Sequence, residues 1–130
     1  MPQRMTRLLR ANAFEGSYYD LGDCAQHVGS NNYLVTVFWD LGEFQRVTVT
    51  SNSNLLIYFE NMVAGRRLVL VLEQDDTGGG RVTLWPWYVY WSGGTAPTLS
   101  TAPGAVDLIE FLCMGVRTVY GRLWGRCAGP

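Results

Sequence analysis

Apolar and polar positions alternate along most of the chain that follows residue 32. From Tyr33 to Trp39 every second residue is a large apolar side chain, which is the period of two expected of a β-strand. Segment 44–50 alternates in the same way, and 67–74 is a nearly continuous run of Leu and Val, typical of a strand covered on both faces. Turn-forming residues separate these runs. The expected strands are 33–39, 44–50, 55–59, 67–74, 81–85, 87–91, 106–114 and 117–124.

Short strands with turns every eight to twelve residues predict an all-β fold. The fold class that we expect is an antiparallel β-sandwich or jelly-roll-like domain over residues 33–130. Residues 11–32 are rich in Asn, Gly, Ser and Asp, so 1–32 is expected to be an N-terminal arm and loop, with short extended pieces in 11–32.

The composition points to a protein partner. The 130 residues suit one domain, and 48% are hydrophobic but only 16% charged, where about 25% is usual. A net charge of −1 gives no field that would attract nucleic acid, and the apolar runs are shorter than the roughly 18 residues of a membrane helix. We therefore expect neither a nucleic-acid nor a membrane partner, and expect the missing polar surface to be covered by neighbouring protein.

The aromatic run from Trp85 to Trp91 is the strongest local signal. On one continuous strand, Trp85, Trp87 and Trp91 would share a face, with Tyr88 and Tyr90 on the other. One face can join the core, whereas the other predicts either a subunit interface or a sugar-stacking surface. The interface is the favoured interpretation, because the chain has few charges with which to cover apolar area. The candidate residues are Trp85, Trp87, Tyr88, Tyr90 and Trp91.

A second candidate contact lies at the N-terminus, where Arg4, Arg7 and Arg10 are interspersed with apolar residues. These arginines could contact packaged DNA, but three charges on a neutral chain are weak evidence for that. Docking onto an acidic patch of a capsid or of a neighbouring subunit is the simpler hypothesis.

Catalytic and metal-binding patterns are weak. His27 is the only histidine, and Asp75 with Asp76 lies in a glycine turn that already explains the two carboxylates. A paired-carboxylate glycosidase would need two of Glu60, Glu73 and Glu110 at a defined separation, and ion pairs with Arg66, Arg67 or Arg117 are the plainer interpretation. The three cysteines, Cys24, Cys113 and Cys127, suit neither a disulfide framework nor a zinc site. We expect no enzyme activity, no metal and no cofactor.

The order of residues between 73 and 107 resembles a β-domain that recurs in structural proteins of tailed bacteriophages. There, a strand ends in Gln-Asp, a Thr-Gly-Gly turn follows, and then come a strand ending in Trp-Pro, a Gly-Gly-Thr-Ala-Pro-Thr-Leu segment and an Ala-Val-Asp. The matching positions are Gln74, Asp75, Thr77, Gly78, Gly79, Trp85, Pro86, Gly93, Gly94, Thr95, Ala96, Pro97, Thr98, Leu99, Ala105, Val106 and Asp107. With the preceding strands, the resemblance covers residues 33–124.

The resemblance implies a virion protein of a usually trimeric family. The function that we expect is that of a capsid decoration or cement protein, which assembles in the host cytoplasm, forms a homotrimer and docks on the major capsid protein. The alternative is a tail-fibre or head-fibre tip that binds a host cell-surface glycan. A glycan hydrolase is a weaker third hypothesis.

Overall fold

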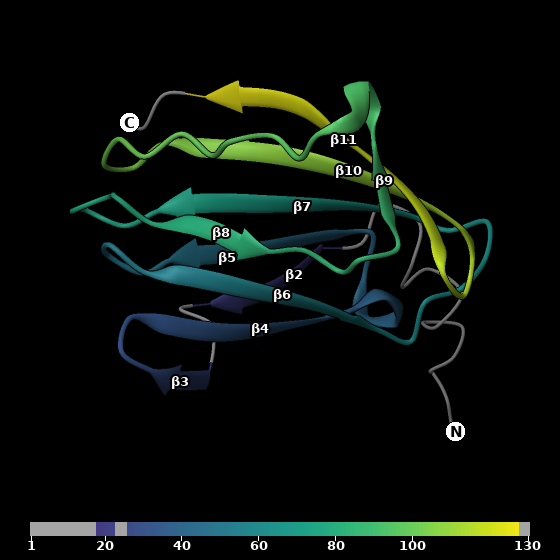
Figure 1. The fold of residues 1–130 in the computed structure, drawn as a ribbon, viewed down its shortest axis with the longest axis horizontal. Coiled ribbons are helices and arrows are strands. Elements are labelled where there is room, and N and C mark those ends of the chain that lie inside the picture. The colour runs from purple at the N-terminus through teal and green to yellow at the C-terminus, as the bar shows by residue number, and fades with distance from the viewer. Residues whose placement is uncertain (1–17, 23–25, 128–130) are drawn as a thin grey trace.

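The structure, a computed structural model, describes residues 18–22 and 26–127 and arranges them as a sandwich of two β-sheets (Figure 1). One sheet has six strands in the order β2-β5-β7-β10-β11-β9, and the other has four in the order β3-β4-β6-β8. Helical structure in the described residues amounts to two short 3-10 turns, η1 (Trp39–Leu41) and η2 (Ser92–Gly94). The strands are β2 (Tyr18–Gly22), β3 (Gln26–Gly29), β4 (Asn32–Phe38), β5 (Phe44–Val49), β6 (Asn54–Glu60), β7 (Arg67–Gln74), β8 (Arg81–Leu84), β9 (Val89–Trp91), β10 (Val106–Gly115) and β11 (Thr118–Cys127). The predicted all-β sandwich is confirmed.

From β4 to β9 the chain crosses to the other sheet after each strand. As a result, β4, β6 and β8 are parallel in the four-stranded sheet, and β5 and β7 are parallel in the six-stranded sheet. Among the described strands, antiparallel pairs join β3 to β4 and join β10 to β7 and β11. The predicted antiparallel, jelly-roll-like arrangement is therefore wrong. A chain that crosses to the opposite sheet and returns has reversed twice, so it runs parallel to the strand that it left.

Strand positions follow the sequence pattern closely after residue 32. Residues 11–32 were expected to be loop with short extended pieces, and within the described part of this segment β2 pairs with β5 and β3 pairs with β4, each as an edge strand. Both strands are short, with four or five residues each.

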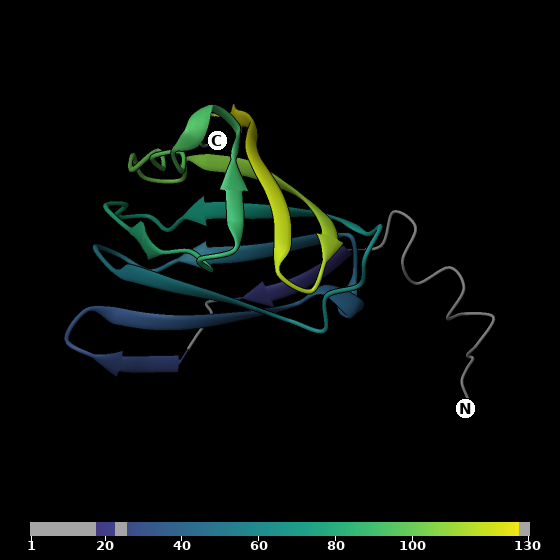
Figure 2. The same ribbon diagram turned by 45° about the vertical axis from the view of Figure 1, so that its right-hand side comes forward.

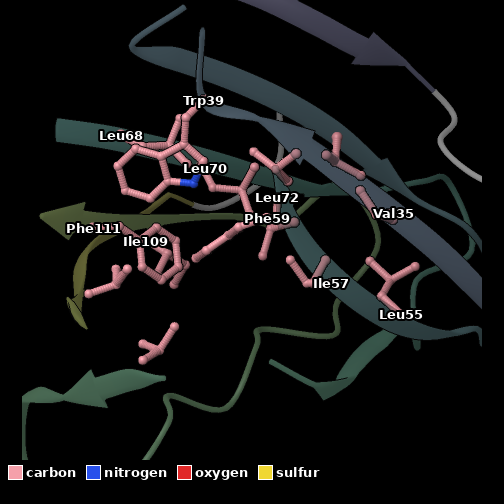
Figure 3. Close-up of a cluster of buried hydrophobic side chains, with 14 of the residues drawn as sticks. Val35, Trp39, Leu55, Ile57, Phe59, Leu68, Leu70, Leu72, Ile109 and Phe111 are labelled. Carbon is pink, nitrogen blue, oxygen red and sulfur yellow. The ribbon is translucent and has the colours of Figure 1, made fainter. Parts of the chain in front are cut away.

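The core fills the space between the sheets with side chains from alternating strand positions (Figure 3). Trp39 of η1 packs edge-on against Phe59 of β6 with ring centroids 5.4 Å apart, and Phe59 meets Phe111 of β10 at 5.1 Å. These rings connect the four-stranded sheet to the six-stranded one. Burial of each such side chain contributes roughly 1.5–3 kcal/mol.

A buried glutamine holds the crossing between β4 and β5. The Gln45 amide nitrogen donates hydrogen bonds to the carbonyl oxygens of Phe38 at 2.8 Å and of Gly42 at 3.0 Å. Because these carbonyls flank η1, the side chain fixes the turn that carries the chain from one sheet to the other.

Candidate functional site

A pocket of about 300 Å³ lies on the outer face of the six-stranded sheet, where β9, β10 and β11 meet. The parallel pairing of β9 with β11 sets Tyr90 beside Tyr120, with ring centroids 6.2 Å apart and planes tilted by 55°. Figure 2 shows β9 next to β11 at this edge of the sheet. The lining residues are Tyr90, Trp91, Ser92, Glu110, Leu112, Tyr120, Gly121 and Arg122.

Close packing beneath the pocket explains why the tyrosines face outward. Val89 and Trp91 point toward the core, so Tyr90 between them points outward. Gly121 pairs with Trp91, and a Cβ at Gly121 would lie 2.9 Å from Trp91 Cζ3 and 3.1 Å from Phe111 Cδ1. Glycine therefore allows the Trp91 ring to pack across β11.

An ion-pair network borders the pocket. The Glu110 side chain, in a residue only 8% exposed, accepts hydrogen bonds from Arg122 Nε at 2.7 Å and from an Arg67 terminal nitrogen at 3.0 Å. Arg67 Nε also donates to Glu43 at 2.7 Å, and this hydrogen bond is the main reason why the pKa of Arg67 lies above its ordinary value. Because both Glu110 oxygens accept a hydrogen bond from an arginine, the carboxylate is held in place.

Arg122 is anchored at one end and open at the other. Its Nε bonds Glu110, and within the part of the chain that the structure describes its two terminal nitrogens have no protein hydrogen-bond partner. Because the bond to Glu110 already restricts the Arg122 side chain, a ligand that bonds the terminal nitrogens causes a smaller loss of side-chain entropy on binding.

The outer face of the four-stranded sheet is different in kind, because it is apolar. The strand register places Leu34, Leu56 and Leu84 in one row across β4, β6 and β8. On the same face, Tyr58, 43% exposed, follows Leu56 in β6, and Phe38, 38% exposed, lies at the end of β4 beyond Thr36. We call these five residues the leucine face. Sequence reasoning missed it, although Leu56 and Tyr58 alternate with buried positions in β6.

The aromatic run does not lie on one strand with a single alternation of faces. β8 ends at Leu84 and β9 begins at Val89, with Pro86 in the segment between them. Trp87 is 72% exposed, with the Arg117 guanidinium 5.8 Å from its ring centroid. The prediction that Trp87 shares a face with Trp85 and Trp91 is therefore wrong, because proline interrupts the pairing that would have kept the alternation.

The other aromatic candidates divide between core and surface. Trp85 and Trp91 meet edge-on at 5.1 Å, and both contact Phe111. Tyr88 is half-buried near Phe59, with ring centroids 6.5 Å apart. Tyr90 is thus the member of the run that lines the pocket from an exposed position. The candidate arginines Arg4, Arg7 and Arg10 lie outside the described residues.

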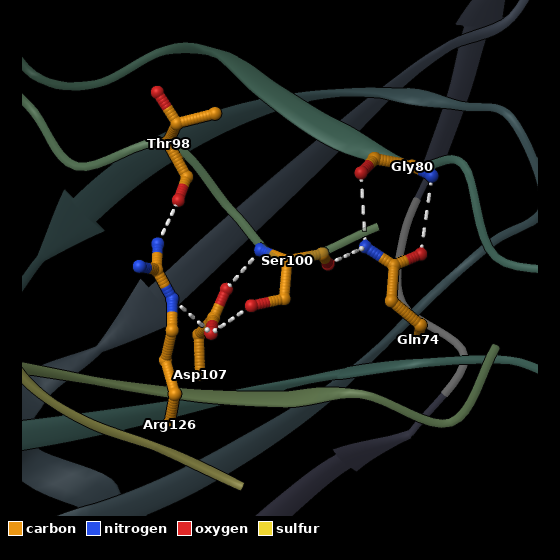
Figure 4. Close-up of polar contacts among 6 residues, drawn as sticks. All are labelled: Gln74, Gly80, Thr98, Ser100, Asp107 and Arg126. Atoms are coloured by element: carbon orange, nitrogen blue, oxygen red, sulfur yellow. Dashed lines mark hydrogen bonds and ion pairs between the residues drawn. The ribbon is translucent and has the colours of Figure 1, made fainter. Parts of the chain in front are cut away.

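Three of the residues that carry the phage resemblance, Gln74, Thr98 and Asp107, take part in polar contacts that hold loops (Figure 4). The Gln74 amide donates to the carbonyls of Gly80 and Ser100, each at 2.9 Å. Asp107, 2% exposed, accepts hydrogen bonds from Ser100 N at 2.6 Å, Ser100 Oγ at 2.9 Å and Arg126 Nε at 3.0 Å. Arg126 also donates to the Thr98 carbonyl. These hydrogen bonds attach the 92–105 loop to the six-stranded sheet, so the role of these residues is structural.

Asp75 has a similar role in the glycine turn. Its carboxylate accepts hydrogen bonds from Ser51 Oγ at 2.5 Å and from the backbone nitrogens of Gly78 and Thr77 at 2.9 and 3.0 Å. Partial burial raises the pKa of Asp75, but these hydrogen bonds outweigh it and lower the pKa below its ordinary value.

The remaining polar candidates are dispersed. His27 Nε2 lies 2.5 Å from the Ser30 carbonyl oxygen in the β3–β4 hairpin. Among the described residues no three His, Cys, Asp or Glu side chains come together in a way that would hold a metal ion. Cys113 is a buried free thiol and Cys127 an exposed one, while Cys24 lies outside the described residues. Glu110 pairs with Arg67 as the sequence suggested, whereas Glu73 pairs with Arg46.

Comparison of the chain with protein-family models, with curated proteins and with solved structures finds no significant match. In the described part of the chain, no helix has the length and apolar character needed to cross a membrane.

Proposed function

We propose that this protein is a non-enzymatic structural subunit of a bacteriophage particle that self-associates as a homotrimer through the leucine face. The observation that carries the proposal is the row of Leu34, Leu56 and Leu84 on the outside of a folded sheet. A soluble surface rarely keeps such a row uncovered, and covering a half-exposed Leu or Tyr contributes roughly 1 kcal/mol.

The position of the face suits association between copies. The middle of the leucine face carries no charged side chain. Glu60 lies at the end of β6 and Arg81 at the start of β8, so the charged residues are at opposite edges of the face. An apolar centre with charged residues at its rim is the usual composition of an interface between protein subunits. The low share of charged residues, 16% of the chain, fits the same interpretation.

The proposed place of the oligomer is the phage head, as a decoration protein that docks on the major capsid protein. The resemblance of residues 33–124 to phage structural β-domains supports this location. In the proposal, Arg4, Arg7 and Arg10 contact an acidic patch of the shell, because a basic segment suits such a patch.

Self-association is tested by placing a charge in the centre of the leucine face. Light scattering of the purified wild-type chain is expected to give three times the mass of one chain. Leu56→Arg is expected to lower the association constant by at least about 100-fold, because the interface would have to bury an unpaired charge. A wild-type protein that is monomeric at all concentrations tested would refute the proposal.

Leu108→Arg is the matched control, because Leu108 lies on the outer face of the six-stranded sheet and receives the same charge. We expect this variant to associate like the wild type. Thermal unfolding of both variants checks that each is folded.

Labelling purified phage particles with antibodies to this protein tests the location. Label over the head supports the decoration role, and the triple variant with Ala at Arg4, Arg7 and Arg10 is then expected to remain trimeric but to lose binding to capsids. Absence of the protein from particles would contradict the proposal.

A receptor-binding fibre tip is the second candidate function. The pocket around Tyr90 and Tyr120 favours it, because paired exposed aromatic rings with nearby hydrogen-bond donors suit a carbohydrate. Label over the tail instead of the head would support this candidate.

A further inference from the structure

We infer that the pocket between β9, β10 and β11 is a saccharide-binding site that holds one pyranose ring. The inference rests on the pocket geometry alone and is independent of self-association through the leucine face, which belongs to the other sheet. Its volume of about 300 Å³ lies at the lower end of the range for small-molecule sites, which suits a single sugar ring better than a large ligand.

Two tyrosines supply the apolar part of the site. Tyr90 is 53% exposed and Tyr120 is 49% exposed, so both rings are available to a ligand. Their 55° tilt at 6.2 Å forms an angled aromatic surface, against which the C–H face of a pyranose can pack. Leu112 extends the apolar wall on β10.

Arg122 and Ser92 supply the polar part. The terminal nitrogens of Arg122 are donors, and Ser92 Oγ and the tyrosine hydroxyls both donate and accept. Neighbouring hydroxyls on a pyranose present acceptors in pairs, which the fork of a guanidinium can meet with two hydrogen bonds. Glu110 is a positioning residue, because its carboxylate holds Arg122 by Nε.

The same residues indicate binding without hydrolysis. Glu110 is the one carboxylate among the residues described as lining the pocket, and both its oxygens bond arginines. Glycoside hydrolysis by the common mechanisms needs two carboxyl groups on either side of the bond that breaks. The pocket therefore offers recognition of a sugar but not the paired acid and base.

The test begins with a glycan array that displays oligosaccharides of the common hexoses, N-acetylhexosamines and sialic acids. The methyl glycosides of the terminal sugars that bind are then titrated into the full-length protein and followed by NMR chemical shifts. Tyr120→Ala and Tyr90→Ala are each expected to weaken binding about tenfold, whereas Tyr120→Phe keeps the ring and retains most of the affinity.

Two variants separate the polar contact from the ion pair. Arg122→Ala is expected to weaken binding by about tenfold or more, and Arg122→Lys to restore the pairing with Glu110 but only part of the binding. Trp87→Ala serves as the matched control, because it removes an exposed aromatic ring outside both the pocket and the leucine face. This variant is expected to bind the sugar like the wild type.

The inference is overturned if no array sugar binds, or if the Tyr90 and Tyr120 variants bind as the wild type does. It is also overturned if those variants change the mass of the oligomer, because the pocket would then be part of a protein interface. Thermal unfolding of each variant shows whether a loss of binding reflects loss of the fold.

Discussion

The outer faces of the two sheets differ in charge. On the six-stranded sheet, charged residues neutralise one another: Glu110 meets Arg67 and Arg122, and Arg46 bridges Asp20 and Glu73 at 3.0 and 2.9 Å. The four-stranded sheet presents the leucine face, whose central positions carry no charge. Among the described residues, these ion pairs lie on the outer face of the six-stranded sheet, whereas the middle of the leucine face carries no charged side chain.

This difference shows that the few charged residues of the described chain are distributed unevenly between the two outer faces. On the outer face of the six-stranded sheet, acids and arginines pair with each other, and Glu110 and Arg122 of this network border the pocket. The leucine face has no such internal partners for its exposed apolar area. Composition alone predicts a protein partner but does not say which face it covers.

The largest expected effect comes from the packing that supports the six-stranded face. Gly121→Ala is expected to lower the free energy of unfolding by about 1–3 kcal/mol, because its Cβ would press on Trp91 and Phe111. Urea unfolding measures the change. Gly125→Ala is the control on the same strand, since its Cβ would lie 3.7 Å from Leu108 Cδ1 and should alter stability by less than about 0.5 kcal/mol. Equal effects at the two glycines would show that close packing under the pocket is not what holds this edge.

A smaller effect is expected when one residue on each outer face is replaced by alanine and the unfolding free energies are compared. Arg67→Ala is expected to cost about 1–2 kcal/mol of unfolding free energy, because Glu43 and the nearly buried Glu110 both lose a partner. Leu84→Ala, on the half-exposed leucine face, is expected to cost less in the monomer and to weaken association instead. The comparison between the faces fails if Leu84→Ala destabilises the monomer more than Arg67→Ala does. Denaturant unfolding at a concentration where the protein is monomeric gives both values.

The smallest expected effect is on the pH dependence of stability, and it involves Asp75 in the turn that follows β7. The pKa of Asp75 is lower in the folded chain than its ordinary value of 3.8, so the ionised form favours folding above that pH. This contribution is lost as the pH falls below 3.8 and through the folded pKa. Asp75→Asn is therefore expected to be less stable than the wild type at neutral pH and to lose less stability on acidification. Thermal unfolding across pH 2–7 tests this, and parallel curves for the two proteins would contradict it.

The alternation of side chains predicted the strands well but not their partners. Val35 and Val37, and later Val47 and Val49, point inward as a period of two requires. The segment between Phe38 and Phe44 resembles a hairpin turn in sequence, yet it carries the chain to the opposite sheet. Short polar connections look alike in both cases, so periodicity gives the face of a residue without giving its neighbour.

The candidate pocket shows the same limit. Tyr90 was a candidate from the aromatic run, but Tyr120 lies thirty positions further along the chain and reaches it only through the parallel pairing of β9 with β11. The signal that was present is the outward alternation of Tyr120, Arg122 and Trp124 in the last strand. The pairing of Glu110 with Arg67 was one of several acid–arginine pairings that the sequence allowed, because charges on apolar strands need a partner of opposite sign.

The crossing of the chain between sheets has a consequence for how the protein folds. Because β4 to β9 alternate between the sheets, paired strands are not consecutive in the chain. For example, β5 pairs with β7, and β6 of the opposite sheet lies between them in sequence. Apart from the β3–β4 and β10–β11 hairpins, the strand pairs of both sheets therefore join segments that are distant in the chain. A topology with so many non-local pairs has high contact order, which predicts slow folding.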